Sequence, residues 1–143
     1  MRVKLAGTTD FYEDEARCKC GCGLILLHPG MAEALQEART EFGRPMNPLS
    51  WCRCVAHNAR PAAEGGAGGH PHSLHVGDFP FHADKGQRGT LGVDLAAADG
   101  RYRGDLFALL WKRGWSIGWN AKRLFLHGDL RILIGMPQQS FDY

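Results

Sequence analysis

The sequence predicts one α+β domain, because helical spacing of hydrophobic residues in two segments is combined with strict alternation in two others. The 143 residues are enough for one hydrophobic core, and 44% hydrophobic with 22% charged residues is typical of a globular protein. We therefore treat residues 1–143 as a single domain. No segment repeats another.

The first half of the chain contains one predicted helix and one long irregular segment. A short hydrophobic run over 23–28 ends at Pro29 and Gly30, and a helix is expected over 31–42, where Gly43 stops it. Its inner face consists of Met31, Leu35, Ala38 and Phe42. The segment from about 58 to 89 is rich in glycine, proline and histidine, and loops of that length in a small domain are usually functional or disordered.

The second half is predicted to run strand, helix, strand. Leu91, Val93 and Leu95 share one face of a strand over 91–95, which leaves Asp94 on the other face. A helix is expected over 103–113, ending at Gly114, with an inner stripe of Leu106, Leu109 and Leu110.

Alternation then continues over 123–134, which predicts a strand with a hydrophobic and a polar face. The hydrophobic face contains Leu124, Leu126, Leu130, Ile132 and Ile134, and the other face contains Phe125, His127, Asp129 and Arg131. A histidine and a carboxylate side by side suit a metal site or a proton transfer. The alternative interpretation is an ordinary surface pair on an amphipathic strand.

Charge and hydropathy argue against nucleic acid or a membrane span. Seventeen basic and fifteen acidic residues give a formal charge of +2, and no block of lysine or arginine concentrates it. No run approaches the length of a transmembrane segment, and the first ten residues contain no signal-like hydrophobic stretch. We expect a protein that is cytoplasmic as synthesised and that acts at the cell wall only after release; oligomeric state is not predicted.

The five cysteines form two groups, Cys18, Cys20 and Cys22 in one and Cys52 and Cys54 in the other. Their spacing is not that of a Cys-x2-Cys zinc ribbon, and an odd number argues against a complete disulfide framework. They are interpreted as buried or incidental thiols, and the alternative is that the two groups converge on a structural metal or a disulfide.

The order of several short motifs resembles one enzyme family, the zinc D-alanyl-D-alanine carboxypeptidases and L-alanyl-D-glutamate endopeptidases, in particular their small bacterial and phage-type branch. These motifs are Ser50-Trp-Cys-Arg53, His57-Asn58, Gly65-Gly66, Ser73-Leu-His75, Gly89 to Asp94, Gly114 to Gly118 and Phe125 to Arg131. The resemblance runs from about 11 to 131. It implies a hedgehog-like α+β fold, in which an antiparallel sheet flanked by helices carries a zinc ion.

The same resemblance assigns roles to individual residues. His75, Asp94 and His127 are the implied zinc ligands, and such a three-ligand set leaves one position open for water, as in catalytic zinc sites. Arg53 is implied to bind a substrate carboxylate or the oxyanion, and Ser73 to lie near the substrate. His28, His70 and His72 are interpreted as surface residues.

Three assignments leave alternatives open, namely the second zinc ligand, the general base and the aromatic residues of the groove. His82 stands seven residues after His75, the usual family spacing of the second ligand, and competes with Asp94. Leu124 occupies the place of the family's acidic residue, so Asp129 becomes the candidate general base, with an orienting role as its alternative. Two further carboxylates, Asp78 and Asp84, are the reserve candidates for that base. Trp115 and Trp119 are candidate groove aromatics or core residues.

The predicted function is therefore zinc-dependent hydrolysis of peptide bonds in the stem peptides of bacterial peptidoglycan. Two other classes remain. One is a catalytically inactive module of the same fold that keeps the zinc and binds the cell wall or a protein, which Leu124 favours. The other is a cysteine-dominated metal or redox protein, whose activity would depend on Cys20 or Cys54 instead of His127.

Overall fold

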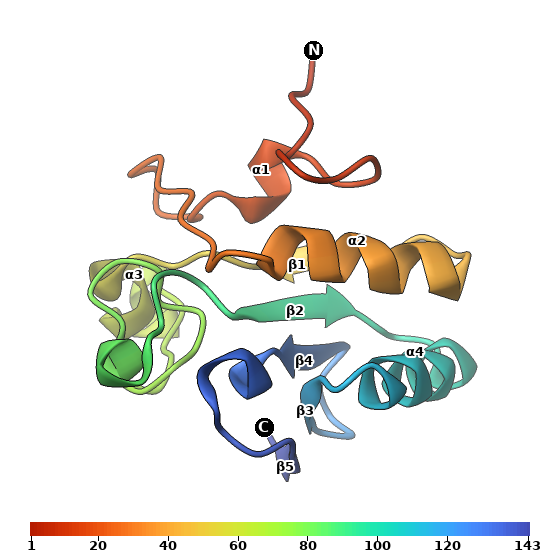
Figure 1. Cartoon of the computed structure of the whole chain (residues 1–143). Coiled ribbons are helices and arrows are strands. Elements are labelled where there is room, and N and C mark those ends of the chain that lie inside the picture. The colour runs from red at the N-terminus through yellow and green to blue at the C-terminus, as the bar shows by residue number, and fades with distance from the viewer.

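The computed structural model describes residues 1–143 and is built around one five-stranded sheet in the order β1-β2-β4-β3-β5 (Figure 1). The strands are β1 (Pro48–Ser50), β2 (Gly92–Ala96), β3 (Ser116–Trp119), β4 (Phe125–Asp129) and β5 (Ser140–Asp142). Neighbours are antiparallel except at the edge, where β5 pairs with β3 in parallel. The α+β prediction is confirmed, and the sheet is mainly antiparallel, as expected.

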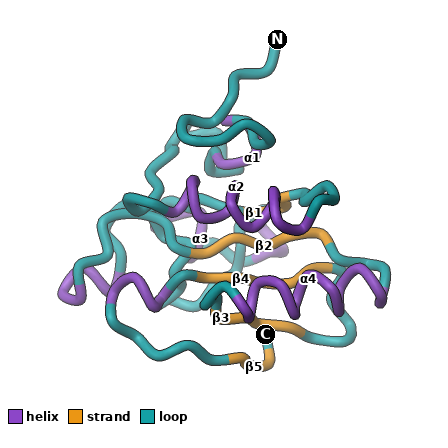
Figure 2. The backbone as a smooth tube through the Cα atoms, turned by 45° about the vertical axis from the view of Figure 1, so that its right-hand side comes forward, coloured by secondary structure: helices purple, strands orange, loops and turns teal.

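Four α-helices and three 3-10 turns surround the sheet. The helices are α1 (Glu13–Ala16), α2 (Met31–Phe42), α3 (Val55–Ala59) and α4 (Gly100–Lys112), and the 3-10 turns are η1 (Ala62–Glu64), η2 (Phe81–Lys85) and η3 (Arg131–Ile134). Helices α2 and α4 lie in front of the sheet in Figure 2, and α3 lies behind it. No helix of the structure has the length and hydrophobicity needed to cross a membrane.

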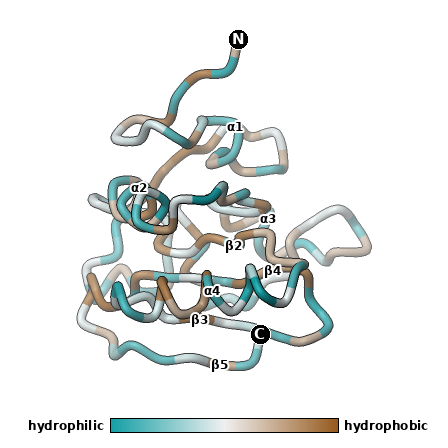
Figure 3. Tube along the Cα trace, turned by 90° about the vertical axis from the view of Figure 1, so that its right-hand side faces the viewer, coloured by the Kyte–Doolittle hydropathy of each residue, from teal (hydrophilic) through white to brown (hydrophobic).

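The hydrophobic core fills the space between the sheet and the two longer helices. Strands β2, β3 and β4 turn Val93, Leu95, Ile117 and Leu126 into this layer, and all four are fully buried. The chain of α4 alternates between hydrophobic and hydrophilic residues in Figure 3, as expected for a helix that covers one face of a sheet. Polar residues of β2 and β4 therefore point to the opposite face of the sheet.

Both predicted helices are confirmed, and only the second differs from its predicted bounds, by three residues at its start and one at its end. Helix α2 has the predicted bounds and ends at Gly43, whose φ of 70° and N–H bond to the Arg39 carbonyl form a left-handed cap. Helix α4 begins at Gly100, three residues before the predicted start, because the Asp99 side chain accepts hydrogen bonds from the N–H groups of Arg101 and Tyr102.

The long strand predicted over 123–134 is wrong beyond Asp129. The Asp129 carboxylate accepts the N–H of Arg131, which turns the chain into η3 and ends the ladder. Ile132 is consequently 48% exposed, and Leu124, which precedes β4, is 65% exposed. Only the Leu126, Leu130 and Ile134 side chains of the predicted hydrophobic face are buried.

The predictions for residues 91–95 and 58–89 agree with the structure more closely than the prediction for 123–134. The strand predicted over 91–95 is β2, displaced by one residue. The segment from 58 to 89 is irregular apart from the end of α3 and the two short turns η1 and η2.

Candidate metal centre

The register of β2 and β4 places two polar side chains opposite each other on the face away from α2 and α4. Asp94 of β2 pairs directly with His127 of β4, and Gly92 pairs with Asp129. A Cβ atom at Gly92 would lie 3.0 Å from His127 Cε1 and 3.4 Å from the backbone nitrogen of His75. Glycine at this position therefore gives the two histidines room to approach each other.

His75 reaches the same point from the irregular segment. Its carbonyl accepts hydrogen bonds from the N–H of Arg53 at 3.0 Å and from Thr90 Oγ1 at 2.7 Å. These bonds join the segment to the residues after β1 and before β2, and the His75 side chain is completely buried. A side chain from a loop is thus held as firmly as one from a strand.

The three predicted ligands converge within hydrogen-bonding distance of one another. His75 Nε2 lies 3.1 Å from Asp94 Oδ1, His127 Nδ1 lies 3.1 Å from the same oxygen, and the two ring nitrogens are 3.2 Å apart. All three residues are buried. Ligands of a tetrahedral zinc ion at 2.0–2.1 Å are separated by about 3.3 Å, so this arrangement is compatible with a metal ion.

The second nitrogen of each imidazole has its own acceptor, which defines the tautomers. His75 Nδ1 lies 2.7 Å from the Trp51 carbonyl oxygen, and His127 Nε2 lies 2.8 Å from Asp129 Oδ2. The N–H of each ring donates to that acceptor, so the other nitrogen, His75 Nε2 or His127 Nδ1, directs its lone pair to the shared site. Two lone pairs and a carboxylate oxygen at this separation repel one another unless a proton or a metal ion lies between them.

The electrostatics of the site favour a cation. Burial works against ionisation of Asp94, but the adjacent His75 and His127 outweigh it and hold the pKa of Asp94 well below its usual range. Burial lowers the pKa of His75. Burial also opposes the charge on His127, yet hydrogen bonds to Asp129 and Asp94 raise the pKa of His127 to about 9. The metal-free centre therefore holds a proton at neutral pH on His127.

Asp129 lies behind His127 and away from the shared site. It is fully buried and binds Arg131 through two hydrogen bonds, of 2.8 Å to Nε and 2.7 Å to Nη2. Burial raises the pKa of Asp129, but bonds to Arg131 and His127 prevail and lower it to about 2. The imidazole ring stands between this carboxylate and the ligand atoms, which favours the orienting role over the role of general base.

Arg53 is also occupied by protein partners. Its Nη2 lies 3.1 Å from Asp94 Oδ2, its Nη1 binds Asn58 Oδ1 at 3.2 Å, and its Nε binds Ser50 Oγ at 3.0 Å. The guanidinium thus holds the Asp94 oxygen that does not face the histidines. Since only 5% of Arg53 is exposed, any contact with a substrate is made by its edge at the cavity wall.

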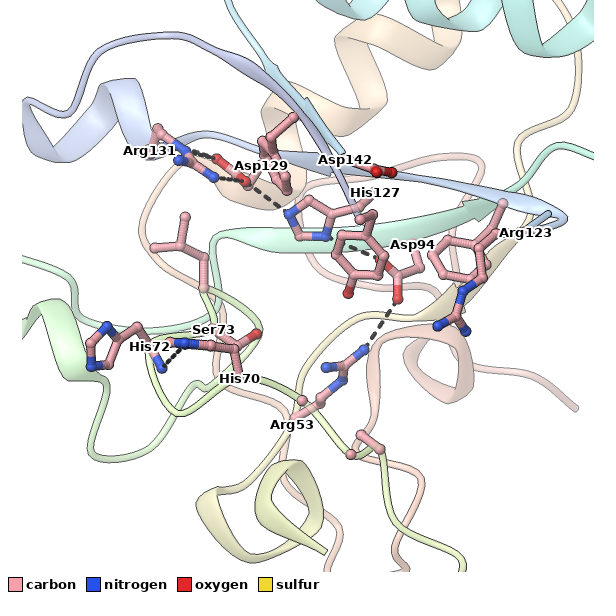
Figure 4. A pocket seen from close by; sticks show the side chains of 17 residues that line it. Arg53, His70, His72, Ser73, Asp94, Arg123, His127, Asp129, Arg131 and Asp142 are labelled. Atoms are coloured by element: carbon pink, nitrogen blue, oxygen red, sulfur yellow. Dashed lines mark hydrogen bonds and ion pairs between the residues drawn. The ribbon is translucent and has the colours of Figure 1, made fainter. Parts of the chain in front are cut away.

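Asp94 and His127 line a cavity of about 660 Å³ (Figure 4), whereas His75 is completely buried and does not line it. Ser73 lines this cavity and accepts a hydrogen bond from the His75 N–H. His70 and His72 are exposed, as predicted, but they line the same cavity. Arg53 and Arg123 lie on one side of it in Figure 4, and Arg131 lies on the other.

The glycine-rich loop forms part of this wall. A Cβ atom at Gly69 would lie 2.1 Å from Asn58 Oδ1 and 2.9 Å from Arg53 Nη1. The Asn58 amide in turn donates a hydrogen bond to the His70 carbonyl. Glycine is therefore required where the loop packs on the pair that holds Asp94.

Two aromatic residues that the sequence did not indicate also belong to the site, Phe141 of β5 and Tyr143, which directly follows β5. The Tyr143 ring stacks on the His127 ring, with centroids 4.9 Å apart and an angle of 17° between the planes. The centroid of the Phe141 ring lies 5.8 Å from that of His127. They reach across β3 because Gly118 has no side chain, and a Cβ atom there would lie 2.6 Å from Phe141. Only the parallel pairing of β5 with β3 brings them here, and no local pattern signals that pairing.

Other candidates from the sequence lie elsewhere. Trp115 is buried in the core, whereas Trp119 is 45% exposed and lines a separate shallow cavity with Asn120 and Lys122. His82 does not join the three-residue cluster, and neither Asp78 nor Asp84 lines the main cavity. Asp78 instead accepts the N–H of Val55.

Comparisons with protein-family models, with curated proteins and with solved structures gave no match for this chain. The site is therefore interpreted from its own geometry.

Proposed function

We propose that the protein is a zinc peptidase of hedgehog-like fold that hydrolyses bonds in the stem peptides of bacterial peptidoglycan. The observation that carries the proposal is the convergence of His75 Nε2, Asp94 Oδ1 and His127 Nδ1 within 3.2 Å, with Asp94 and His127 lining an open cavity. Three nitrogen and oxygen ligands with one open position are typical of catalytic zinc sites, whereas structural sites are closed by four ligands.

The surrounding residues suit such an ion. Each ligand has an outer partner, namely the Trp51 carbonyl for His75, Arg53 for Asp94 and Asp129 for His127. Outer partners of this kind orient ligands and adjust their basicity. A zinc ion, when bound, would polarise a peptide carbonyl and lower the pKa of water at the open position.

The residues of the chain itself would bind and orient the substrate. Arg53 is placed to hold Asp94 and to present its edge to a developing negative charge, and Ser73 is available for a hydrogen bond at the wall. Asp142 also lines the cavity, but it alternates along the chain with Phe141 and Tyr143, which face His127, and it accepts a hydrogen bond from Asn120, so its carboxylate points away from the centre.

Digestion of purified peptidoglycan and defined muropeptides tests the function. Zinc-loaded protein is expected to release fragments cut next to D-alanine or D-glutamate, and a chelator should abolish this cleavage. Casein should stay intact under the same conditions. Absence of cleavage in every peptidoglycan fragment, or hydrolysis of casein at a comparable rate, would reject the proposal.

Arg123 provides a prediction about substrate binding. It lines the cavity and forms no ion pair with any acidic side chain, so its guanidinium is available for a carboxylate of the stem peptide. Arg123→Ala is expected to raise KM about tenfold, equivalent to the loss of about 1.4 kcal/mol, with little change in kcat. Lys122→Ala is the matched control, because Lys122 lies outside the main cavity. Equal KM values for both variants would contradict this role.

Two observations favour the second candidate, an inactive zinc module that binds the cell wall. Leu124 is exposed where the resembling enzymes have an acid, and Asp129 is separated from the ligand atoms by the His127 ring. An inactive module would bind peptidoglycan fragments in a metal-dependent manner and cleave none of them. Binding and cleavage assays on the same fragments distinguish the two candidates.

A further inference from the structure

Four cysteine sulfurs meet at a second point of the molecule. Cys18, Cys20 and Cys22 from the loop after α1 join Cys54 at the start of α3, and all four sulfurs lie within 4.8 Å of one another. Two of the separations are 3.6 Å, from Cys18 to Cys20, and 3.7 Å, from Cys20 to Cys54. We infer that these residues form a structural zinc site, independent of the His–Asp–His centre.

The separations match tetrahedral coordination. Sulfurs bound to one zinc ion at about 2.3 Å are about 3.8 Å apart, close to the two values above. A disulfide requires about 2.05 Å and would join only two of the four. The fifth cysteine, Cys52, is buried away from the cluster, with its sulfur 3.8 Å from the Leu26 carbonyl oxygen. Four zinc ligands and one buried thiol therefore account for the odd number of cysteines.

The backbone around the cluster is arranged for thiolates. Cys18 Sγ accepts the N–H of Cys54 at 3.4 Å, and Cys54 Sγ accepts the N–H of His57 at 3.3 Å. Such bonds to sulfur are a usual outer partner of metal-bound thiolates. Gly21 and Gly23, with φ of 86° and 81°, lie on either side of Cys22, and these left-handed positions turn the chain so that Cys20 and Cys22 can face one point.

The loop has little else to hold it in place. No residue from 17 to 24 belongs to the hydrophobic core cluster, and of the three cysteines in the loop only Cys18 is buried, whereas Cys20 and Cys22 are exposed. A closed four-thiolate site would attach this loop to the start of α3 and contribute folding free energy directly. Cys54 follows Arg53, so the same ion would also fix the segment that holds Asp94.

Metal content of the protein purified without added metal tests the inference. Wild-type protein is expected to contain two zinc ions per chain. The double variant Cys20→Ser/Cys22→Ser should contain one and unfold at a lower temperature. Cys52→Ala, the matched control, should retain both. Because Cys20 and Cys22 are exposed, their replacement by serine leaves no cavity in the core.

A second measurement does not depend on the folding of the cysteine variants. His127→Ala should retain one zinc ion, and X-ray absorption at the zinc edge should show four sulfurs at about 2.3 Å and no nitrogen ligand. The inference would be overturned if the spectrum showed nitrogen or oxygen ligands, if the variant held iron in place of zinc, or if it held no metal. It would also be overturned if the mass of the unreduced protein showed a disulfide between two of the four cysteines. The measurement on His127→Ala needs neither peptidase activity nor a metal at the His–Asp–His centre, so failure of the proposed function leaves it intact.

Discussion

His127→Ala is expected to release the metal of the His–Asp–His centre and to abolish peptide hydrolysis. The substitution removes one of three converging ligand atoms, and Asp94 and His75 alone leave the site with two. Removal of an outer partner lowers metal affinity about 10- to 100-fold. The loss of zinc affinity in His127→Ala should be larger than that. Titration of the metal-free protein with zinc, followed by muropeptide digestion, measures both effects.

Two histidines serve as controls for His127. His72 lines the same cavity without facing the shared site, and His82 stands at the alternative ligand position in the sequence. His72→Ala and His82→Ala should bind zinc at this centre as the wild type does. Loss of zinc in His82→Ala together with retention in His127→Ala would refute the ligand assignment.

Asp129→Asn is expected to weaken zinc binding about 10- to 100-fold while leaving activity near normal once zinc is saturating. The asparagine can still accept the His127 N–H, but Arg131 loses the charge it now pairs with. The Asp129 carboxylate also helps to raise the pKa of His127 to about 9. In the metal-free variant, the pKa of His127 should therefore fall, which an NMR titration of the ring measures.

The general-base role that the sequence suggested for Asp129 has a different signature. A lost base lowers turnover by at least about a hundredfold at full zinc occupancy. That result with Asp129→Asn would contradict the orienting role. Asp142→Asn is the control, because Asp142 lines the cavity but points away from His127, and it should leave turnover and zinc affinity near the wild-type values.

The sequence by itself determined the elements that depend on local pattern. The hydrophobic spacing and Gly43 predicted α2 completely, and alternation placed Asp94 and His127 on polar faces of strands. The expected ligand set, including His75 from the irregular segment, is the set whose atoms converge. The helices and strands were predictable because periodicity and capping act between residues close in sequence, whereas the ligand set was implied by the resemblance of the motifs and not by periodicity.

Tertiary structure alone decided the remaining features. Asp129 shares the His127 face by alternation, yet its hydrogen bonds to Arg131 hold it behind the ring, and the same turn ends the strand that the pattern extended to Ile134. Tyr143 covers His127 only because β5 pairs with β3 across Gly118. The sulfurs of Cys20 and Cys54 meet although 34 positions separate them. Such contacts depend on how distant segments pack, and spacing along the chain carries no record of that packing.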